Sequence, residues 1–179
     1  QRTANRRDFA IAPPAPTLLD WVQCAGRPTH AVGKIGDIFS MKGIGTLHKG
    51  TSDLGLVRHL MALADKAEEG SFTFANLVEF DSLYGHRRDV AGYARALEIF
   101  DRQAGVFLAR LHAGDIAVFT ADHGNDPTWH GTDHTRERVP VLVAGAGKGA
   151  LGLVAFSDVA ASIAAHLGVS NHGTGRTFL

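Results

Sequence analysis

The sequence contains a single cysteine, Cys24, among its 179 residues. One cysteine cannot form a disulfide within the chain, which fits a reducing compartment. No apolar run reaches the roughly 18 residues that a membrane-spanning helix needs, and no segment joins the charged, apolar and small-residue parts of a signal peptide. We therefore expect a cytoplasmic protein with no membrane partner.

The chain also lacks an excess of charge of either sign. Lys and Arg total 18, and Asp and Glu total 18. A balanced charge creates no global field that would draw the protein to nucleic acid or to an anionic membrane surface. We therefore expect no nucleic-acid partner, and any bound anion must be held by a local cluster of side chains. The first residue is Gln1 and not Met, so we expect a processed, truncated or partial chain.

Short apolar segments alternate with amphipathic ones along the chain. Helical spacing of apolar residues predicts helices at 17–25, 52–69, 88–112 and 158–167, and short apolar runs predict strands at 30–33, 72–80, 116–120 and 139–144. Ser52 and Ser157 are expected to cap two of these helices, and the glycine-rich residues 33–50 are expected to form a loop. This alternation predicts an α/β fold with a largely parallel sheet covered by helices on both faces.

Acidic and imidazole side chains follow two of the predicted strands. Asp81 ends one strand, and a tight turn then brings His86 round. The other strand is followed by Asp122 and His123, and a few residues later by His134. Open α/β sheets bind ligands just beyond the carboxyl ends of their strands, because loops from several strands converge there. We therefore expect these side chains to lie close together.

This set of side chains matches the ligand preferences of divalent metals. Carboxylate oxygens and neutral imidazole nitrogens suit Mn²⁺, Zn²⁺ or Mg²⁺. Five ligands are too many for one metal with an open position and few for two metals. Two ions about 3.5–4 Å apart would clamp the attacking and leaving oxygens of a phosphoryl transfer. In the alternative interpretation, the acidic residues belong to turns and caps, and the histidines are solvated.

Four strings in the sequence resemble the phosphopentomutase family of the alkaline phosphatase superfamily. They are AVGKIGDIF (31–39), NLVEFDSLYGHRRDVAGYARALE (76–98), TADHGNDPTW (120–129) and GTDHTRE (131–137). The resemblance implies an alkaline phosphatase-like core and an isomerase that interconverts ribose or deoxyribose 1-phosphate and 5-phosphate through a phosphothreonine enzyme. A bisphosphate sugar is implied as the intermediate and as a possible activator.

The same resemblance implies two Mn²⁺ ions. Asp81, His86 and His134 match the ligand positions of one ion, and Asp122 and His123 match those of the other. The nearest alternative is a phosphatase or a phosphoglycerate mutase of the same superfamily with the same metals. An alternative of a different class is a non-catalytic metal-binding fragment.

The family's nucleophilic threonine belongs to an N-terminal segment that is not in this sequence. No threonine here matches that position; the threonines near the predicted ligands are Thr120, Thr128, Thr132 and Thr135. Residues 1–12 then correspond to the end of a cap domain and its linker, and residues 13–179 to the C-terminal part of the metal-binding core. We expect the N-terminal segment of the same enzyme as a partner, and no mutase activity from this chain alone.

Several cations are candidates for contacts with a pentose phosphate. Lys34 follows a predicted strand and can meet a phosphate as a point charge, and Arg2 can form bidentate bonds from the cap side. Both can instead be solvated loop or linker charges. Arg87 and Arg88 can steer an anion, or they can be the solvated start of a helix.

Overall fold

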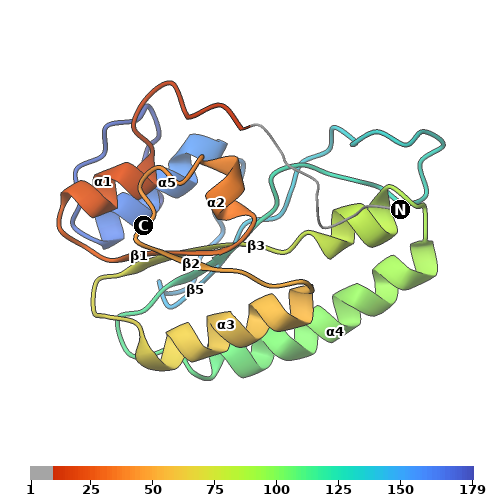
Figure 1. Cartoon of the computed structure of the whole chain (residues 1–179), viewed down its shortest axis with the longest axis horizontal. Coiled ribbons are helices and arrows are strands. Elements are labelled where there is room, and N and C mark those ends of the chain that lie inside the picture. Colours follow the sequence, from red (N-terminus) through yellow and green to blue (C-terminus); the bar gives the residue numbers. More distant parts are fainter. Residues whose placement is uncertain (1–9) are drawn as a thin grey trace. The chain divides into compact units, whose positions relative to one another are not determined.

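The computed structural model describes residues 10–179 and divides the chain into two compact units (Figure 1). The first unit contains α1 (Leu18–Cys24), β1 (Thr29–Gly33), α2 (Ile35–Ile38), β2 (Thr46–His48), β3 (Phe72–Asn76) and α5 (Phe156–His166). The second unit contains α3 (Asp53–Lys66), the π-helix η1 (Phe80–Gly85), α4 (Val90–Leu108), β4 (Ala117–Phe119) and β5 (Leu142–Ala144). Among the described helices, none combines the length and apolar character needed to cross a membrane.

A three-stranded parallel sheet forms the centre of the first unit. Its strand order is β2-β1-β3, and His30 of β1 lies opposite Thr46 of β2 and Thr73 of β3. The first four residues of β1 are buried, as expected for a central strand of a parallel sheet. Figure 1 shows α1, α2 and α5 on one side of these strands.

Apolar side chains of α1 hold the first unit together. Leu19, only 1% exposed, packs with Ala31 of β1 and Ile35 of α2. On the same helix, Val22 packs with Ala164 of α5. Each fully buried leucine or valine contributes about 1.5–3 kcal/mol relative to an exposed one. The core of the first unit therefore depends mainly on apolar burial.

One glycine permits this packing. Gly43 has a φ of +67°, and a Cβ at this position would lie 2.5 Å from the backbone nitrogen of Asp20. A side chain would therefore meet backbone that cannot move aside without shifting α1, and only glycine adopts this φ without strain. The close approach of the segment after α2 to α1 thus requires glycine.

Aromatic rings link the elements of the second unit. Phe80 of η1 contacts Tyr93 and Phe100 of α4, with ring centroids 5.7 and 5.9 Å apart. Phe119 of β4 contacts Phe100 and also Phe107, at 6.1 and 6.3 Å. Edge-to-face pairs of this kind add roughly 0.5–1.5 kcal/mol beyond their buried area. These ring contacts fix η1 and the end of β4 against α4. The residues of the candidate site described below lie within η1 or follow these two elements in the chain.

The N-terminus of α3 is tied to the segment that leads into η1. Ser52 caps the helix, as predicted, and accepts a hydrogen bond from the Gly55 amide at 3.2 Å. The Asp53 carboxylate accepts from the backbone amides of Val78 and Glu79, at 3.0 and 3.1 Å. Burial raises the pKa of Asp53 to about 6, and the nearby Glu79 carboxylate adds to the shift although the two amide bonds oppose it.

The predicted parallel sheet is confirmed, and the four predicted helices correspond to α1, α3, α4 and α5. Three local predictions are wrong. The glycine-rich loop 33–50 contains α2 and β2, because Ile35 and Leu47 join the apolar core. The predicted strand 72–80 stops at Asn76. The last helix begins at Phe156, so Ser157 lies inside it, and the Asp158 side chain accepts the Ala155 amide instead.

One further difference concerns strand pairing. β4 and β5 form an antiparallel pair, with Val118 opposite Val143, whereas a largely parallel sheet was expected. Pairing between strands 25 positions apart is set by tertiary packing, which periodicity does not reveal. Of the predicted linker 1–12, residues 1–9 lie outside the described residues.

Candidate metal centre

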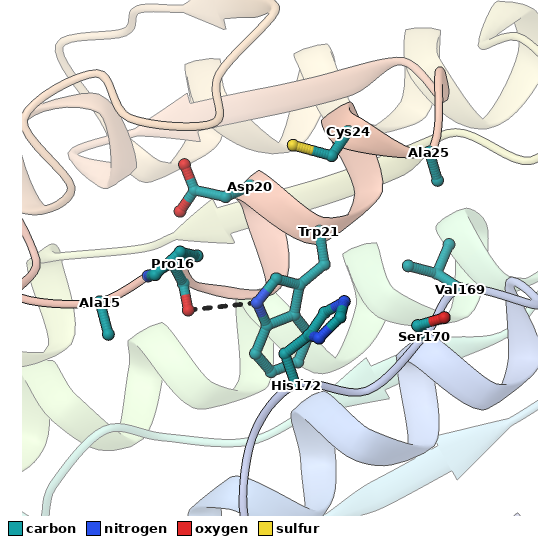
Figure 2. Close-up of a pocket in the computed structure, with 9 residues that line it drawn as sticks. All are labelled: Ala15, Pro16, Asp20, Trp21, Cys24, Ala25, Val169, Ser170 and His172. Carbon is teal, nitrogen blue, oxygen red and sulfur yellow. Dashed lines mark hydrogen bonds between the residues drawn. The ribbon is translucent and has the colours of Figure 1, made fainter.

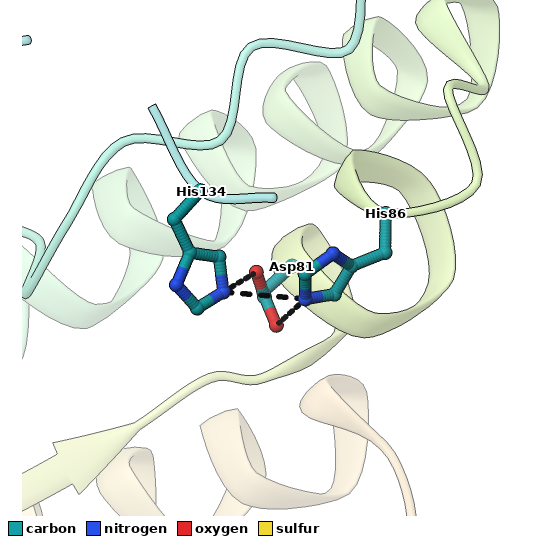
Figure 3. A group of neighbouring side chains, drawn as sticks. All are labelled: Asp81, His86 and His134. Carbon is teal, nitrogen blue, oxygen red and sulfur yellow. Dashed lines mark hydrogen bonds and ion pairs between the residues drawn. The ribbon is translucent and has the colours of Figure 1, made fainter. Parts of the chain in front are cut away.

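Three of the predicted ligands meet at one point of the second unit (Figure 3). The Nε2 atom of His134 lies 3.2 Å from Asp81 Oδ1 and 3.2 Å from His86 Nε2. The distance between His86 Nε2 and Asp81 Oδ2 is 3.4 Å. The ligand atoms of these three side chains all lie within 4.8 Å of one another, and no other group of three or more acidic, imidazole or thiol side chains among the described residues does this.

The π-helix explains why Asp81 and His86 face the same point. The amide of His86 donates to the carbonyl of Asp81 at 2.9 Å, so the bond spans five residues instead of four. The wider turn brings residues five apart toward the same side of the helix. In an α-helix, the same two residues would point about 140° apart around the axis. A local π-helix therefore brings a carboxylate and an imidazole together within one short segment.

A backbone carbonyl fixes the tautomer of His86. Its Nδ1 atom lies 2.7 Å from the carbonyl oxygen of Thr132. A carbonyl can only accept, so Nδ1 carries the hydrogen, and in the neutral ring Nε2 has the lone pair. Figure 3 shows this Nε2 atom pointing toward Asp81 and His134. Metal-binding histidines commonly use their second nitrogen in this way, which orients the ring.

The separations between ligand atoms fit a first-row divalent cation. With metal–ligand bonds of about 2.1 Å, two adjacent ligand atoms lie about 3.0 Å apart at an octahedral angle and about 3.4 Å apart at a tetrahedral angle. The three separations observed are 3.2, 3.2 and 3.4 Å. Two imidazoles and one carboxylate also leave coordination positions open, as catalytic sites do.

The other two predicted ligands, Asp122 and His123, lie beside this group. The ring of His123 stacks on that of His134, with centroids 3.7 Å apart and an interplanar angle of 17°. Asp122 Oδ1 lies 3.7 Å from His123 Nε2, and the Asp122 side chain is 70% exposed. The structure thus brings the second predicted pair next to the first group without making it part of the group of three.

Sequence reasoning missed Asn125. This side chain is only 7% exposed, and its Nδ2 donates to Asp81 Oδ1 at 2.7 Å. Its Oδ1 accepts from Arg88 at 2.8 Å. The position between His123 and Asp126 is the only available signal, because the partners of Asn125 are 37 and 44 residues away in the chain.

The interpretation of Arg88 as the solvated start of a helix is wrong, whereas its interpretation as an anion-steering residue stays a prediction. Its guanidinium donates to Asn125 and to backbone carbonyls of the segment that carries His134. The neighbouring Arg87 is exposed.

Two threonine hydroxyls near the site donate to carboxylates. Thr128 Oγ1 donates to Asp126 Oδ1, and Thr135 Oγ1 donates to Glu137 Oε1, both at 2.7 Å. The hydroxyl and amide of Thr128 hold the pKa of Asp126 below its usual value. The bonds of Thr128 lie within the segment between His123 and His134, and the bond of Thr135 directly follows this segment.

Of the two predicted substrate contacts, Lys34 is an exposed residue that follows β1 and precedes α2 in the first unit. Arg2 lies outside the described residues.

A cavity of about 530 Å³ lies in the first unit, beside Trp21 and His172 (Figure 2). Its lining carboxylate, Asp20, accepts from the amide and hydroxyl of Thr17, so the cavity offers mainly apolar surface.

Residues 23–171 match the model of the family described as the metalloenzyme superfamily. The chain belongs to this superfamily. Over the whole chain it is 53% identical to a phosphopentomutase of Chelativorans sp. (strain BNC1), of which it covers 44%. It is 52% identical to a phosphopentomutase of Rhizobium leguminosarum bv. trifolii (strain WSM2304) and 50% identical to one of Agrobacterium fabrum, and it covers 45% of each. This member of the metalloenzyme superfamily thus spans less than half the length of the curated relatives it matches.

Proposed function

We propose that this chain is the metal-binding part of a phosphopentomutase that interconverts ribose or deoxyribose 1-phosphate and 5-phosphate. The observation that carries the proposal is the group of Asp81, His86 and His134, whose ligand atoms converge at distances suited to a divalent cation. The phosphopentomutases that share half of its residues support the choice of reaction. The single cysteine is consistent with a cytoplasmic location.

The proposed cofactor is a pair of Mn²⁺ ions. Asp81, His86 and His134 would hold one ion, and Asp122 and His123 would contribute to the other. Such ions neutralise phosphoryl oxygens and activate a hydroxyl nucleophile. The chain's own contribution is to hold these ligands in place, with the lone pair of His86 Nε2 directed by its Nδ1 bond to Thr132.

The attacking hydroxyl is proposed to come from the part of the enzyme that lies outside this chain. Two observations support this. The curated relatives are more than twice as long as the chain, and the hydroxyls of Thr128 and Thr135 already donate to carboxylates. The proposed partner is therefore the N-terminal segment of the same enzyme. In the reaction, a bisphosphate sugar would be the intermediate and an activator.

Replacement of one ligand tests the proposal. In the complete enzyme, His134→Ala should lower Mn²⁺ affinity and turnover of ribose 1-phosphate by at least the 10–100-fold that loss of an outer ligand partner costs. Mn²⁺ binding would be measured by calorimetry, and turnover with a bisphosphate activator by phosphorus NMR. The exposed His130→Ala variant is the matched control and should keep both properties.

The two measurements also separate the alternatives. Near-normal turnover of His134→Ala at saturating Mn²⁺ would contradict the assignment of this ligand. Release of inorganic phosphate without formation of ribose 5-phosphate would show a phosphatase instead of a mutase. Metal binding without any turnover in the complete enzyme would favour a non-catalytic metal-binding protein.

A further inference from the structure

Arg88 connects the two segments that carry the predicted ligands of the first metal ion. Its Nε atom donates to the Gly131 carbonyl, and its Nη2 atom donates to the Asp133 carbonyl at 3.1 Å. Its Nη1 atom donates to the Asp126 carbonyl at 2.6 Å and to Asn125 Oδ1 at 2.8 Å. The guanidinium follows η1 closely in the chain, whereas its acceptors are 37 to 45 residues further on.

These bonds hold three successive peptide carbonyls just before His134. The carbonyls of Gly131 and Asp133 accept from Arg88, and the carbonyl of Thr132 between them accepts from His86 Nδ1. The peptide that carries His134 is therefore fixed against the end of η1. A guanidinium can do this because its donors point outward in a rigid planar fork, whereas an ammonium group has no such geometry.

The backbone of Arg88 is strained in a manner that fits this role. Its φ of +56° lies in the left-handed region, which a residue with a long side chain rarely adopts. Such conformations persist where surrounding interactions fix them, and they cluster at functional sites. The amide of Arg88 donates to the Gly85 carbonyl at 3.1 Å, so the strained turn directly follows η1.

The hydrogen bonds of Arg88 form a network that also reaches Asp81 through Asn125. The buried Asn125 accepts a hydrogen bond from Arg88 and donates one to Asp81 Oδ1 at 2.7 Å. Asn125 therefore links the guanidinium to the carboxylate. Gly85 makes room for this side chain, since a Cβ there would lie 2.6 Å from Asn125 Nδ2.

We propose that Arg88 is a positioning residue of the metal centre. It fixes the position of His134 through the carbonyls of the preceding peptides, and the position of Asp81 through Asn125. The inference rests on the proposed metal site and deepens it. It assigns the guanidinium to the metal-binding segment and not to a substrate phosphate. Arg88 then controls metal affinity without touching the metal.

The test uses Mn²⁺ and Co²⁺ as probes in the complete enzyme, with Arg88→Lys, Asn125→Leu and the control Arg87→Lys. Mn²⁺ affinity would be measured by electron paramagnetic resonance, and the coordination of Co²⁺ by its visible absorption, which depends on ligand number and geometry. Both network variants should bind Mn²⁺ roughly 10–100-fold more weakly and show an altered Co²⁺ spectrum. Arg87→Lys, the same change at the exposed neighbouring residue, should alter neither.

Four outcomes would overturn the proposal or the metal site on which it rests. Unchanged metal affinity with a raised KM in Arg88→Lys would mean that the guanidinium binds substrate. A lower melting temperature with an unchanged Co²⁺ spectrum in both network variants would mean a purely structural role. Failure of the unmodified enzyme to bind Mn²⁺ or Co²⁺ would reject the metal site itself, whereas equal binding by unmodified and variant enzymes rejects only the role of Arg88.

Discussion

The two units are stabilised by different kinds of interaction. In the first unit, Leu19, Val22 and Val32 are at most 1% exposed, and apolar burial fixes α1 and β1. In the second unit, hydrogen bonds of Arg88 and Asn125 link the segments that form the candidate metal centre. An apolar core tolerates substitutions that keep its volume, whereas a hydrogen-bonded network loses a full interaction when one partner is removed. Changes in the apolar core of the first unit should therefore lower stability without lowering metal affinity.

Leu19→Ala should give the largest loss of stability. Removing a buried leucine side chain costs about 2–5 kcal/mol, because a cavity remains where the chain packed. Mn²⁺ affinity of the folded enzyme should stay unchanged. Urea unfolding and calorimetry would measure the two quantities, with Leu54→Ala, at a leucine that is 49% exposed, as the control. A parallel loss of metal affinity would show that the units do not respond separately.

Asp53→Asn should change how stability depends on pH. The folded pKa of Asp53, about 6, lies above its ordinary value of 3.8, so between these values the folded state binds more protons than the unfolded state. The stability of the unmodified protein should then fall, relative to the variant, as pH rises from about 4 to above 6. Because Asp53 is only partly buried, we expect a relative change of roughly 1–2 kcal/mol. Unfolding free energies that change in parallel with pH for both proteins would contradict this.

Lys34→Ala should separate substrate binding from metal binding. If Lys34 contacts a substrate phosphate, its loss removes a charged hydrogen bond worth roughly 1.5–3 kcal/mol, and KM should rise about tenfold or more. Metal content should not change, because a protonated amine is not a ligand. Steady-state kinetics and metal analysis of the complete enzyme would show this. Loss of metal with an unchanged KM would contradict a role of Lys34 in substrate binding.

Ser52→Ala should give the smallest effect in this series. Loss of the cap leaves the amide of Gly55 without its side-chain acceptor and should cost about 1 kcal/mol. Urea unfolding would measure the change, and Ser52→Thr, which keeps a hydroxyl, should restore most of the stability. A loss above about 3 kcal/mol would show that Ser52 does more than cap α3.

The sequence allowed prediction of those features that depend on local patterns. Apolar spacing predicted α1, α3, α4 and α5, and Ser52 was identified as a cap from its position before an apolar helix. Strand ends followed by acid and imidazole predicted the meeting of Asp81, His86 and His134. That the same residues bind a metal stays a prediction.

The remaining features depend on partners far away in the chain. The predicted strand 72–80 ends at Asn76, and the amides of Val78 and Glu79 donate to Asp53, 25 and 26 residues earlier, instead of joining the sheet. Arg88 likewise finds its acceptors 37 to 45 residues away. No local periodicity contains this information, so a sequence pattern identifies the candidate ligands more readily than the residues that hydrogen-bond to them.

The two tryptophans give each unit a fluorescent reporter of its own. Trp21 of the first unit is 9% exposed, and its indole nitrogen donates to the Pro16 carbonyl at 3.2 Å. Trp129 lies in the segment between His123 and His134, is 52% exposed, and has its ring 4.4 Å from that of His130. Emission of the buried indole lies at shorter wavelength than that of the exposed one. With Trp21→Phe, the indole emission of this chain would thus come from the segment between His123 and His134, and with Trp129→Phe it would come from the apolar core.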